Sequence, residues 1–243
     1  MMMAASGIWY LPPGVSESDV IAAFQFKGAA SASAARQNLA ETGSVYDLTP
    51  SNSPTWDAST GYYLGEGNSY LGDADLNALT TIKTIVIRYS GLSTGHSERL
   101  PLSLIKGRTT AGTDNPLFWA RPNFRYTYNG NEISLSSSYP CIVTSLDMST
   151  SKLKYKLGDV KAAAAGVLAC DASHIYKDGS AITLTSHTVD CDGSITTESN
   201  LNTQYSYSLA SGTDPYYVIA AAFFSKVLSA DDHEWIAEKM MDI

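Results

Sequence analysis

The C-terminal stretch YYVIAAAFFSKVLSADDHEWIAEKMMDI, residues 216–243, limits the possible folds more than any other part of the chain. Residues 217–224 form a continuous apolar run with many aromatic and β-branched side chains, which predicts a strand buried on both faces. Ser229 then stands where a helix N-cap is expected, because its hydroxyl can accept a hydrogen bond from the amide of Asp231 or Asp232. The helix that follows has one apolar stripe, formed by Trp235, Ile236 and Met240. We expect Trp235 to fill the groove between this helix and the sheet.

Other segments of the chain also have the length and composition of strands, among them 20–26, 82–89 and 100–106, and residues 117–128 are predicted to form an aromatic strand pair. Asn129-Gly130 and Asp178-Gly179 predict tight hairpin turns, since both central positions of such a turn need a positive φ. With 44% hydrophobic residues, 16% charged residues and 15 Tyr, the composition is typical of a many-stranded β protein. A length of 243 residues suits one all-β domain. We place this domain at residues 15–243, after an arm or linker at 1–14.

The order of these segments resembles laminin-G-like domains of the concanavalin A-like lectin and glucanase superfamily, of phage or prophage type. The resemblance rests on "VIAAFQF…TGSVYDLT…SPTWDASTGYYLGEGNSYLG", on the hairpin "IYKDGSAIT" and on the ending "KVLSADD". It covers roughly residues 20–243. It implies an all-β, concanavalin A-like jelly-roll sandwich of two antiparallel sheets with a short C-terminal helix. In such domains the first and last strands pair with each other, so 20–26 is expected to pair antiparallel with part of 217–224.

The same superfamily includes glycosidases and polysaccharide lyases, but the chain lacks their motifs. A glycosidase needs two carboxylates across the sugar bond, and this family places them at alternating positions of one strand. The closely spaced acidic pairs, Glu17 with Asp19 and Asp73 with Asp75, lie in polar segments without a third acid in step. The histidines are interpreted as solvated polar residues: His96, His174, His187 and His233. We therefore expect no enzyme; a glycoside hydrolase or lyase with a diverged site is the alternative.

Neither metal nor cofactor is predicted. The segment 190–194 resembles the start of a calcium loop, but the Gly and Glu of an EF-hand are replaced by Ile195 and Leu201. A hairpin turn is favoured there. A structural calcium ion is the alternative, although no motif supports it. The three cysteines, Cys141, Cys170 and Cys191, have no metal-ligand spacing and are expected to be buried reduced thiols. A disulfide between Cys170 and Cys191 also stays open.

The aromatic strand near residue 125 provides the candidate ligand-binding residues. Sugar rings pack their apolar face on aromatic side chains, while Arg and other polar groups bind the hydroxyls. Because strand residues alternate between faces, Arg125 and Thr127 share one face, and Tyr126 and Tyr128 share the other. We expect Arg125 and Thr127 to face a groove on the concave sheet, with the tyrosines in the core. Further candidates outside this strand are Arg121 and an exposed Tyr216 beside the loop 211–215.

These observations favour non-catalytic recognition of a glycan or of a virion or cell-surface protein. A purely structural subunit is a third alternative. The net charge of −8 and the pI near 4.9 argue against nucleic acid as a partner. No stretch has the apolar length of a membrane span, and the N-terminus does not resemble a signal peptide. We therefore expect synthesis in the cytoplasm, incorporation into a phage tail, fibre or capsid decoration, and homo-oligomer formation through the arm at 1–14.

Overall fold

The structure, a computed structural model, describes residues 8–51, 53–64, 70–72, 82–91, 102–104, 119–120, 123–128, 131–136, 140–147, 152–160, 163–171, 173–190, 207–210 and 216–243. In these ranges the chain is mostly β-strand, with one α-helix, α1 (Ala230–Met241). Short 3₁₀ helices interrupt the loops of the N-terminal part, at Glu17–Asp19, Ala34–Arg36 and Gly43–Tyr46. No helix of this described part is long and apolar enough to cross a membrane.

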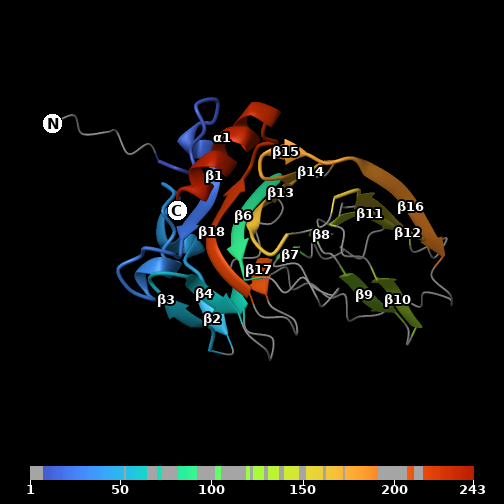
Figure 1. The fold of residues 1–243 in the computed structure, drawn as a ribbon, viewed down its shortest axis with the longest axis horizontal. Helices are drawn as coiled ribbons and strands as arrows, with labels where there is room; N and C mark the ends of the chain where they lie inside the picture. The colour runs from blue at the N-terminus through green and yellow to red at the C-terminus, as the bar shows by residue number, and fades with distance from the viewer. Residues whose placement is uncertain are drawn as a thin grey trace.

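The largest sheet is antiparallel and has eight strands within the described residues. Its order is β15-β14-β13-β6-β18-β4-β3, and β1 also pairs with β18. One edge of β18 therefore pairs with β6, and the other edge is shared by β1 and β4 (Figure 1). The strands are β1 (Val20–Gln25), β3 (Thr55–Asp57), β4 (Gly61–Leu64), β6 (Thr84–Ser90), β13 (Gly166–Cys170), β14 (Ile175–Lys177), β15 (Ser180–Ala181) and β18 (Tyr216–Phe224).

The first and last strands of this sheet pair antiparallel, as predicted. Val20 lies opposite Phe224, and Gln25 lies opposite Ala220. The pairing ties the two ends of the domain together. Ser225 extends it, because its amide donates a hydrogen bond to the carbonyl of Asp19 over 2.9 Å.

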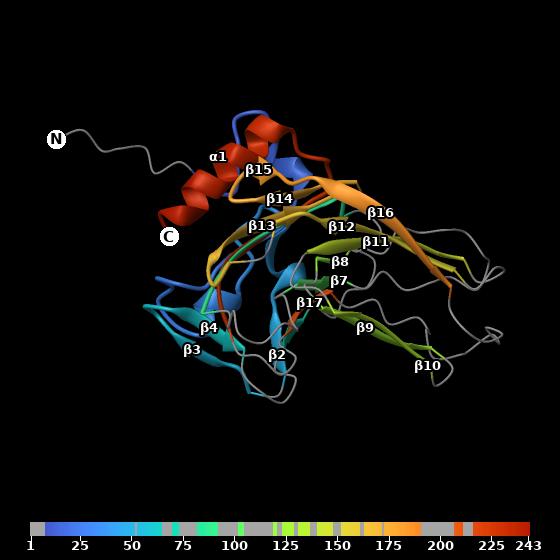
Figure 2. The same cartoon turned by 45° about the vertical axis from the view of Figure 1, so that its right-hand side comes forward.

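Three smaller sheets complete the described β-structure. Figure 2 shows α1 on one side of the large sheet and the five-stranded sheet on the other. The five-stranded sheet contains β2 (Thr49–Ser51), β5 (Tyr70–Gly72), β7 (Leu102–Leu104), β8 (Trp119–Ala120) and β17 (Tyr207–Ala210). The three-stranded sheet contains β11 (Cys141–Asp147), β12 (Lys152–Gly158) and β16 (Leu184–Asp190), and the two-stranded sheet contains β9 (Asn123–Tyr128) and β10 (Asn131–Ser136). The fold is thus an all-β sandwich with a C-terminal helix, as expected; its assignment to the concanavalin A-like superfamily remains a prediction.

Both faces of β18 are buried from Val218 to Phe224, and Tyr217 is half-buried, which confirms most of the prediction for 217–224. The inner face, away from α1, carries an aromatic core that includes Phe24, Phe26 and Phe223. The outer face carries Val86, Ala222 and Phe224, which pack with the apolar side of α1. Cys170 lies in the inner core as a free thiol, and burial raises its pKa to about 12. Its predicted alternative partner, Cys191, lies outside the described residues.

The predicted cap of α1 is present. The Ser229 hydroxyl accepts a hydrogen bond from the Asp232 amide at 3.2 Å, and the Asp232 carboxylate accepts one from the Ser229 amide at 3.0 Å. Ile236 and Met240 are fully buried under the helix. Trp235 is only half-buried at the edge of the outer core, so the expectation that it fills the groove is met in part.

Both predicted hairpins are found. Asp178 and Gly179 have φ values of 50° and 85° between β14 and β15, as the predicted turn requires. Tyr128 lies opposite Asn131, so only positions 129 and 130 connect β9 to β10. Residues 8–14 pack on the domain itself, since Trp9, Tyr10 and Leu11 contact the outer core. Oligomer formation through the arm and the domain boundary at residue 15 remain predictions.

Candidate functional site

The strand that carries most of the predicted ligand-binding residues lies outside the large sheet. Arg125, Tyr126, Thr127 and Tyr128 all belong to β9, whose hydrogen-bonded partner within the described part of the chain is β10. The structure describes the backbone of β9 but not the surroundings of these four side chains. Arg121 lies outside the described residues. Their roles in binding therefore stay predictions.

The expectation that Tyr216 is exposed is wrong. Its side chain is 1% exposed and belongs to the inner aromatic core. The physical reason is a bulge in β18: Val218 lies opposite Tyr89 and Ala220 lies opposite Arg88, which leaves Ile219 as an extra residue. The Ile219 carbonyl accepts hydrogen bonds from the amides of Phe26 and Lys27, at 2.9 and 3.2 Å.

This bulge turns Tyr217, and not Tyr216, to the outer face of the sheet. Strict alternation back from Phe223 would place Tyr217 in the inner core, but the extra residue reverses the order. Tyr217 lies directly opposite Tyr63 of β4, whose neighbours Tyr62 and Leu64 point inward. The rings of Tyr63 and Tyr217 are 5.2 Å apart between centroids, with their planes at 50°. Both rings are half-buried, so each keeps part of its surface in contact with solvent.

The tyrosine pair lies at the centre of a row that crosses four strands. Thr55 of β3 is paired with Tyr63, and Ser90 of β6 is paired with Tyr217. Paired residues point to the same face, so hydroxyl-bearing side chains flank both tyrosines. A pocket of about 580 Å³ opens over this row. We call it the tyrosine pocket; its lining is Thr55, Trp56, Asp57, Ser59, Thr60, Gly61, Tyr63 and Tyr217.

Two positions keep the tyrosine pocket open and rigid. Gly61 has a φ of +91°, and an added Cβ would lie 2.2 Å from the carbonyl oxygen of Val218, so only glycine fits there. Gly61 also lies opposite Asp57 in the pairing of β3 with β4. On the edge strand β3, the Trp56 indole donates a hydrogen bond to the carbonyl of Phe26 over 2.8 Å, which fixes the rim of the pocket.

Asp57 supplies the negative charge of the tyrosine pocket. Its Oδ1 accepts hydrogen bonds from the Ser59 hydroxyl at 2.5 Å and from the Ser59 amide at 2.8 Å. These two bonds, the hydroxyl first, lower the pKa of the Asp57 carboxyl below its ordinary value. The group is therefore ionised at neutral pH. Asp57 is exposed, and its charge faces solvent at the mouth of the pocket.

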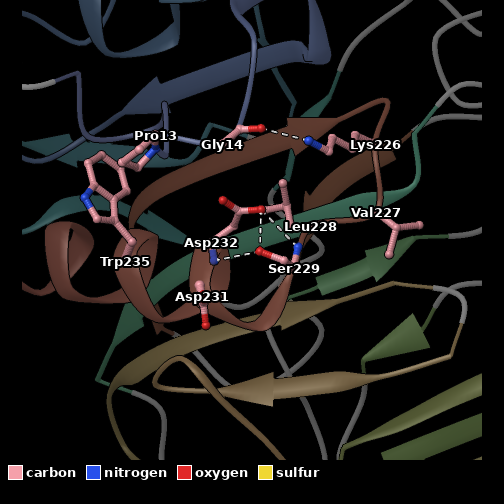
Figure 3. Close-up of a pocket in the computed structure, with 9 residues that line it drawn as sticks. All are labelled: Pro13, Gly14, Lys226, Val227, Leu228, Ser229, Asp231, Asp232 and Trp235. Atoms are coloured by element: carbon pink, nitrogen blue, oxygen red, sulfur yellow. Dashed lines mark hydrogen bonds between the residues drawn. The ribbon is translucent and has the colours of Figure 1, made fainter.

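A second pocket, of about 590 Å³, lies between the N-terminal arm and the start of α1 (Figure 3). Trp235 lies beside Pro13 at one end of it, and the Lys226 ammonium group donates to the Gly14 carbonyl over 2.8 Å. The Asp232 carboxylate is engaged by the backbone and hydroxyl of Ser229. Since these polar groups already bind one another, we assign this arm pocket a structural role in joining the arm to the helix.

The tyrosine pocket can bind a flat, partly apolar ligand that also carries hydroxyl groups. Tyrosine rings offer apolar surface, and Asp57, Ser59 and Thr60 offer acceptors and donors at its edge. Hydrolysis of a sugar bond requires two carboxylates, and the lining of this pocket contributes one. Within the described part of the chain, no three His, Cys, Asp or Glu side chains gather as metal ligands would.

The sequence contained a usable indication of this site. Tyrosine doublets occur at 62–63 and 216–217, and alternation requires one tyrosine of each doublet to point away from the core. Only the second doublet was predicted to contribute to ligand binding, and its outward-facing member is Tyr217 rather than Tyr216. The first doublet lies in a segment that carries the family resemblance, and Tyr63 was not among the predicted ligand-binding residues.

Comparisons with known proteins leave the family of the chain open. No family model matches it, and no curated protein matches it. It is similar to the solved binding domain of botulinum neurotoxin serotype C1, with 10% identity, a TM-score of 0.48 and 92% of this chain and 52% of that chain covered. It is also similar to the binding domain of botulinum neurotoxin DC in complex with SialylT, with 13% identity, a TM-score of 0.44 and coverage of 93% and 52%. The chain thus spans about half the length of these structures, and the fold assignment rests on the strand topology described above.

Proposed function

We propose that this domain is a non-catalytic glycan-binding module, and that a sugar ring packs on the Tyr63–Tyr217 pair. The observation that carries the proposal is the pairing of two half-buried tyrosines on adjacent strands, beneath an open pocket lined with hydroxyl groups. The apolar face of a pyranose ring packs on aromatic side chains, and its hydroxyls bind polar groups at the rim.

The position of the pair on the large sheet favours a ligand that binds without large changes in the protein. Tyr217 lies between β4 and β6 and is held by backbone pairing on both sides. An added Cβ on Gly91 would lie 3.0 Å from the Tyr217 ring, so this glycine leaves room for the ring in its observed position. A ligand surface that is already in place costs little ordering entropy on binding.

A glycan array tests the proposal. We expect the purified protein to bind a defined subset of glycans, and Tyr63→Ala and Tyr217→Ala each to weaken binding to the best ligand about tenfold, through lost ring contact. Trp235→Ala is the matched control, since this half-buried aromatic residue belongs to the arm pocket. Equal loss in all three variants, or loss in Trp235→Ala alone, would contradict the tyrosine pocket as the site. An array without a ligand would remove the proposed function itself.

We further propose, from the sequence, that the domain acts as a component of a phage virion. In that setting the tyrosine pocket would attach the particle to a glycan of the host surface. Mass spectrometry of purified particles from a lysate that contains the protein tests this role. Recovery of the protein only outside the particles would overturn it.

A further inference from the structure

The tyrosine pocket contains one charged side chain, and that charge sets which glycans it can accept. Of the residues that line it, Asp57 alone has an acidic or basic side chain, and this side chain is charged at neutral pH; the others are aromatic, hydroxyl-bearing or glycine. The inference that follows rests on the proposed function and concerns the ligand class of the same site.

Asp57 is fixed in place rather than free to turn away. Ser59 binds Oδ1 with both its hydroxyl and its amide, and Asp57 itself lies on β3 opposite Gly61. Both hydrogen bonds from Ser59 reach Oδ1, and the exposed carboxylate can accept further hydrogen bonds from a ligand. A carboxylate that is held in this way is a directional acceptor for a sugar hydroxyl.

The distance between Asp57 and the tyrosine row suits one sugar ring. Thr55 marks the row, since it is paired with Tyr63, and Asp57 lies two residues further along the same strand. Two residues of strand span roughly 6.6 Å. A sugar ring on the tyrosine pair therefore brings its edge hydroxyls next to Asp57.

We propose that Asp57 makes the tyrosine pocket selective for neutral glycans and excludes glycans that carry a sialic acid, sulfate or phosphate at the bound residue. The carboxylate accepts hydrogen bonds from the hydroxyls of a neutral sugar. An anionic group in the same place would lie directly against a like charge, and charges in direct contact repel each other even where solvent reaches them. The lining of the pocket offers no Lys or Arg to offset that repulsion.

The test uses a printed array in which glycans occur as matched pairs, with and without a terminal sialic acid or sulfate. For the wild-type protein we expect the neutral member of each recognised pair to bind at least about tenfold more tightly, a difference that shrinks as salt is raised. Asp57→Asn keeps the shape and an acceptor for Ser59 but removes the charge. This variant is expected to bind the neutral member about tenfold more weakly and to lose most of the discrimination. Asp231→Asn, an exposed acid at the start of α1, is the control and should leave both values unchanged.

The outcomes separate the two proposals. If the protein binds glycans through Tyr63 and Tyr217 but prefers the anionic member of a pair, the inference about Asp57 is wrong and the proposed function stands. The same holds if Asp57→Asn leaves the preference unchanged. If no member of any pair binds, the proposed function fails first.

Discussion

The imidazole ring of His233 stacks on the phenol ring of Tyr176, with ring centroids 3.6 Å apart and planes 17° from parallel. His233 lies on α1 and Tyr176 on β14, so this contact joins the closing helix to the large sheet. The His233 side chain is 1% exposed, and neither ring nitrogen has a hydrogen-bond partner among the described residues. The expectation that His233 is a solvated polar residue is therefore wrong.

The first prediction is a loss of stability in acid through His233. Burial lowers its pKa to about 4, with the negative charges of Asp171 and Asp232 opposing the shift and His174 adding to it. Because the folded pKa lies below the unfolded value of about 6.5, the unfolded chain takes up the proton first. The contribution of neutral His233 to the free energy of unfolding should be complete above about pH 6.5. As the pH drops to about 4, the free energy of unfolding should fall by on the order of 3 kcal/mol.

Denaturant unfolding at several pH values between 4 and 7 measures this effect, with the range chosen from the ordinary histidine pKa of about 6.5. His233→Phe keeps the ring stacking but cannot take up a proton, so its stability should change much less over the same range. Ser180→Ala, at an exposed position of β15 that carries no titratable group, is the control and should keep the wild-type slope. An acid slope in His233→Phe equal to that of the wild type would contradict the assignment.

The cap of α1 gives a second prediction. Ser229→Ala removes the acceptor of the Asp232 amide and should lower the free energy of unfolding by about 1 kcal/mol. Ser180→Ala, at an exposed position of β15, should have little effect. Chemical denaturation of both variants measures the difference, and equal stabilities would mean that the capping bond adds nothing.

The third prediction concerns Trp235. Complete burial would give a loss of about 3–5 kcal/mol on truncation to alanine, but a half-buried ring should lose roughly half of that. We therefore expect about 2 kcal/mol for Trp235→Ala, measured by thermal or chemical unfolding. A loss within the range of a fully buried ring would show that the arm covers Trp235 in solution more completely than in the structure.

The hairpin between β14 and β15 gives a fourth prediction. Gly179 has a φ of +85°, and an added Cβ would lie 2.8 Å from the Glu234 Cα in the backbone of α1. Gly179→Ala should therefore destabilise the protein by more than about 1 kcal/mol, because strain and a backbone clash coincide. Asp178→Asn, at the neighbouring turn position with a φ of 50°, should be tolerated far better, because asparagine accepts a positive φ and keeps an acceptor for the Val167 amide. If unfolding experiments find the alanine variant as stable as the wild type, the hairpin does not pack on α1 as described.

The sequence predicted the frame of this fold well because local and long-range patterns agree there. The apolar run at 217–224, the cap at Ser229 and the turn at Asp178-Gly179 each follow from residue types that allow few alternatives. The pairing of the first strand with the last came from the family resemblance, and the structure confirms it.

The binding surface was predicted less well because it depends on a bulge. An isoleucine at position 219 gives no indication in the sequence that the strand contains an extra residue there. Simple alternation therefore assigns Tyr216 and Tyr217 to the wrong faces. The pairing of Tyr217 with Tyr63 also joins positions far apart in the chain, and only the register of β4 against β18 brings them together. Likewise, Asp57 lies opposite Gly61 only because of the register of β3 against β4.

Nuclear magnetic resonance of the tyrosine rings, recorded while the best array glycan is added, tests the central claim most directly. We predict concentration-dependent shifts of the Tyr63 and Tyr217 ring signals, assigned through single Tyr→Phe variants, with the buried Tyr89 signal unchanged as an internal reference. Shifts confined to Tyr126 and Tyr128 of β9, with Tyr63 and Tyr217 unaffected, would contradict the tyrosine pocket as the glycan site.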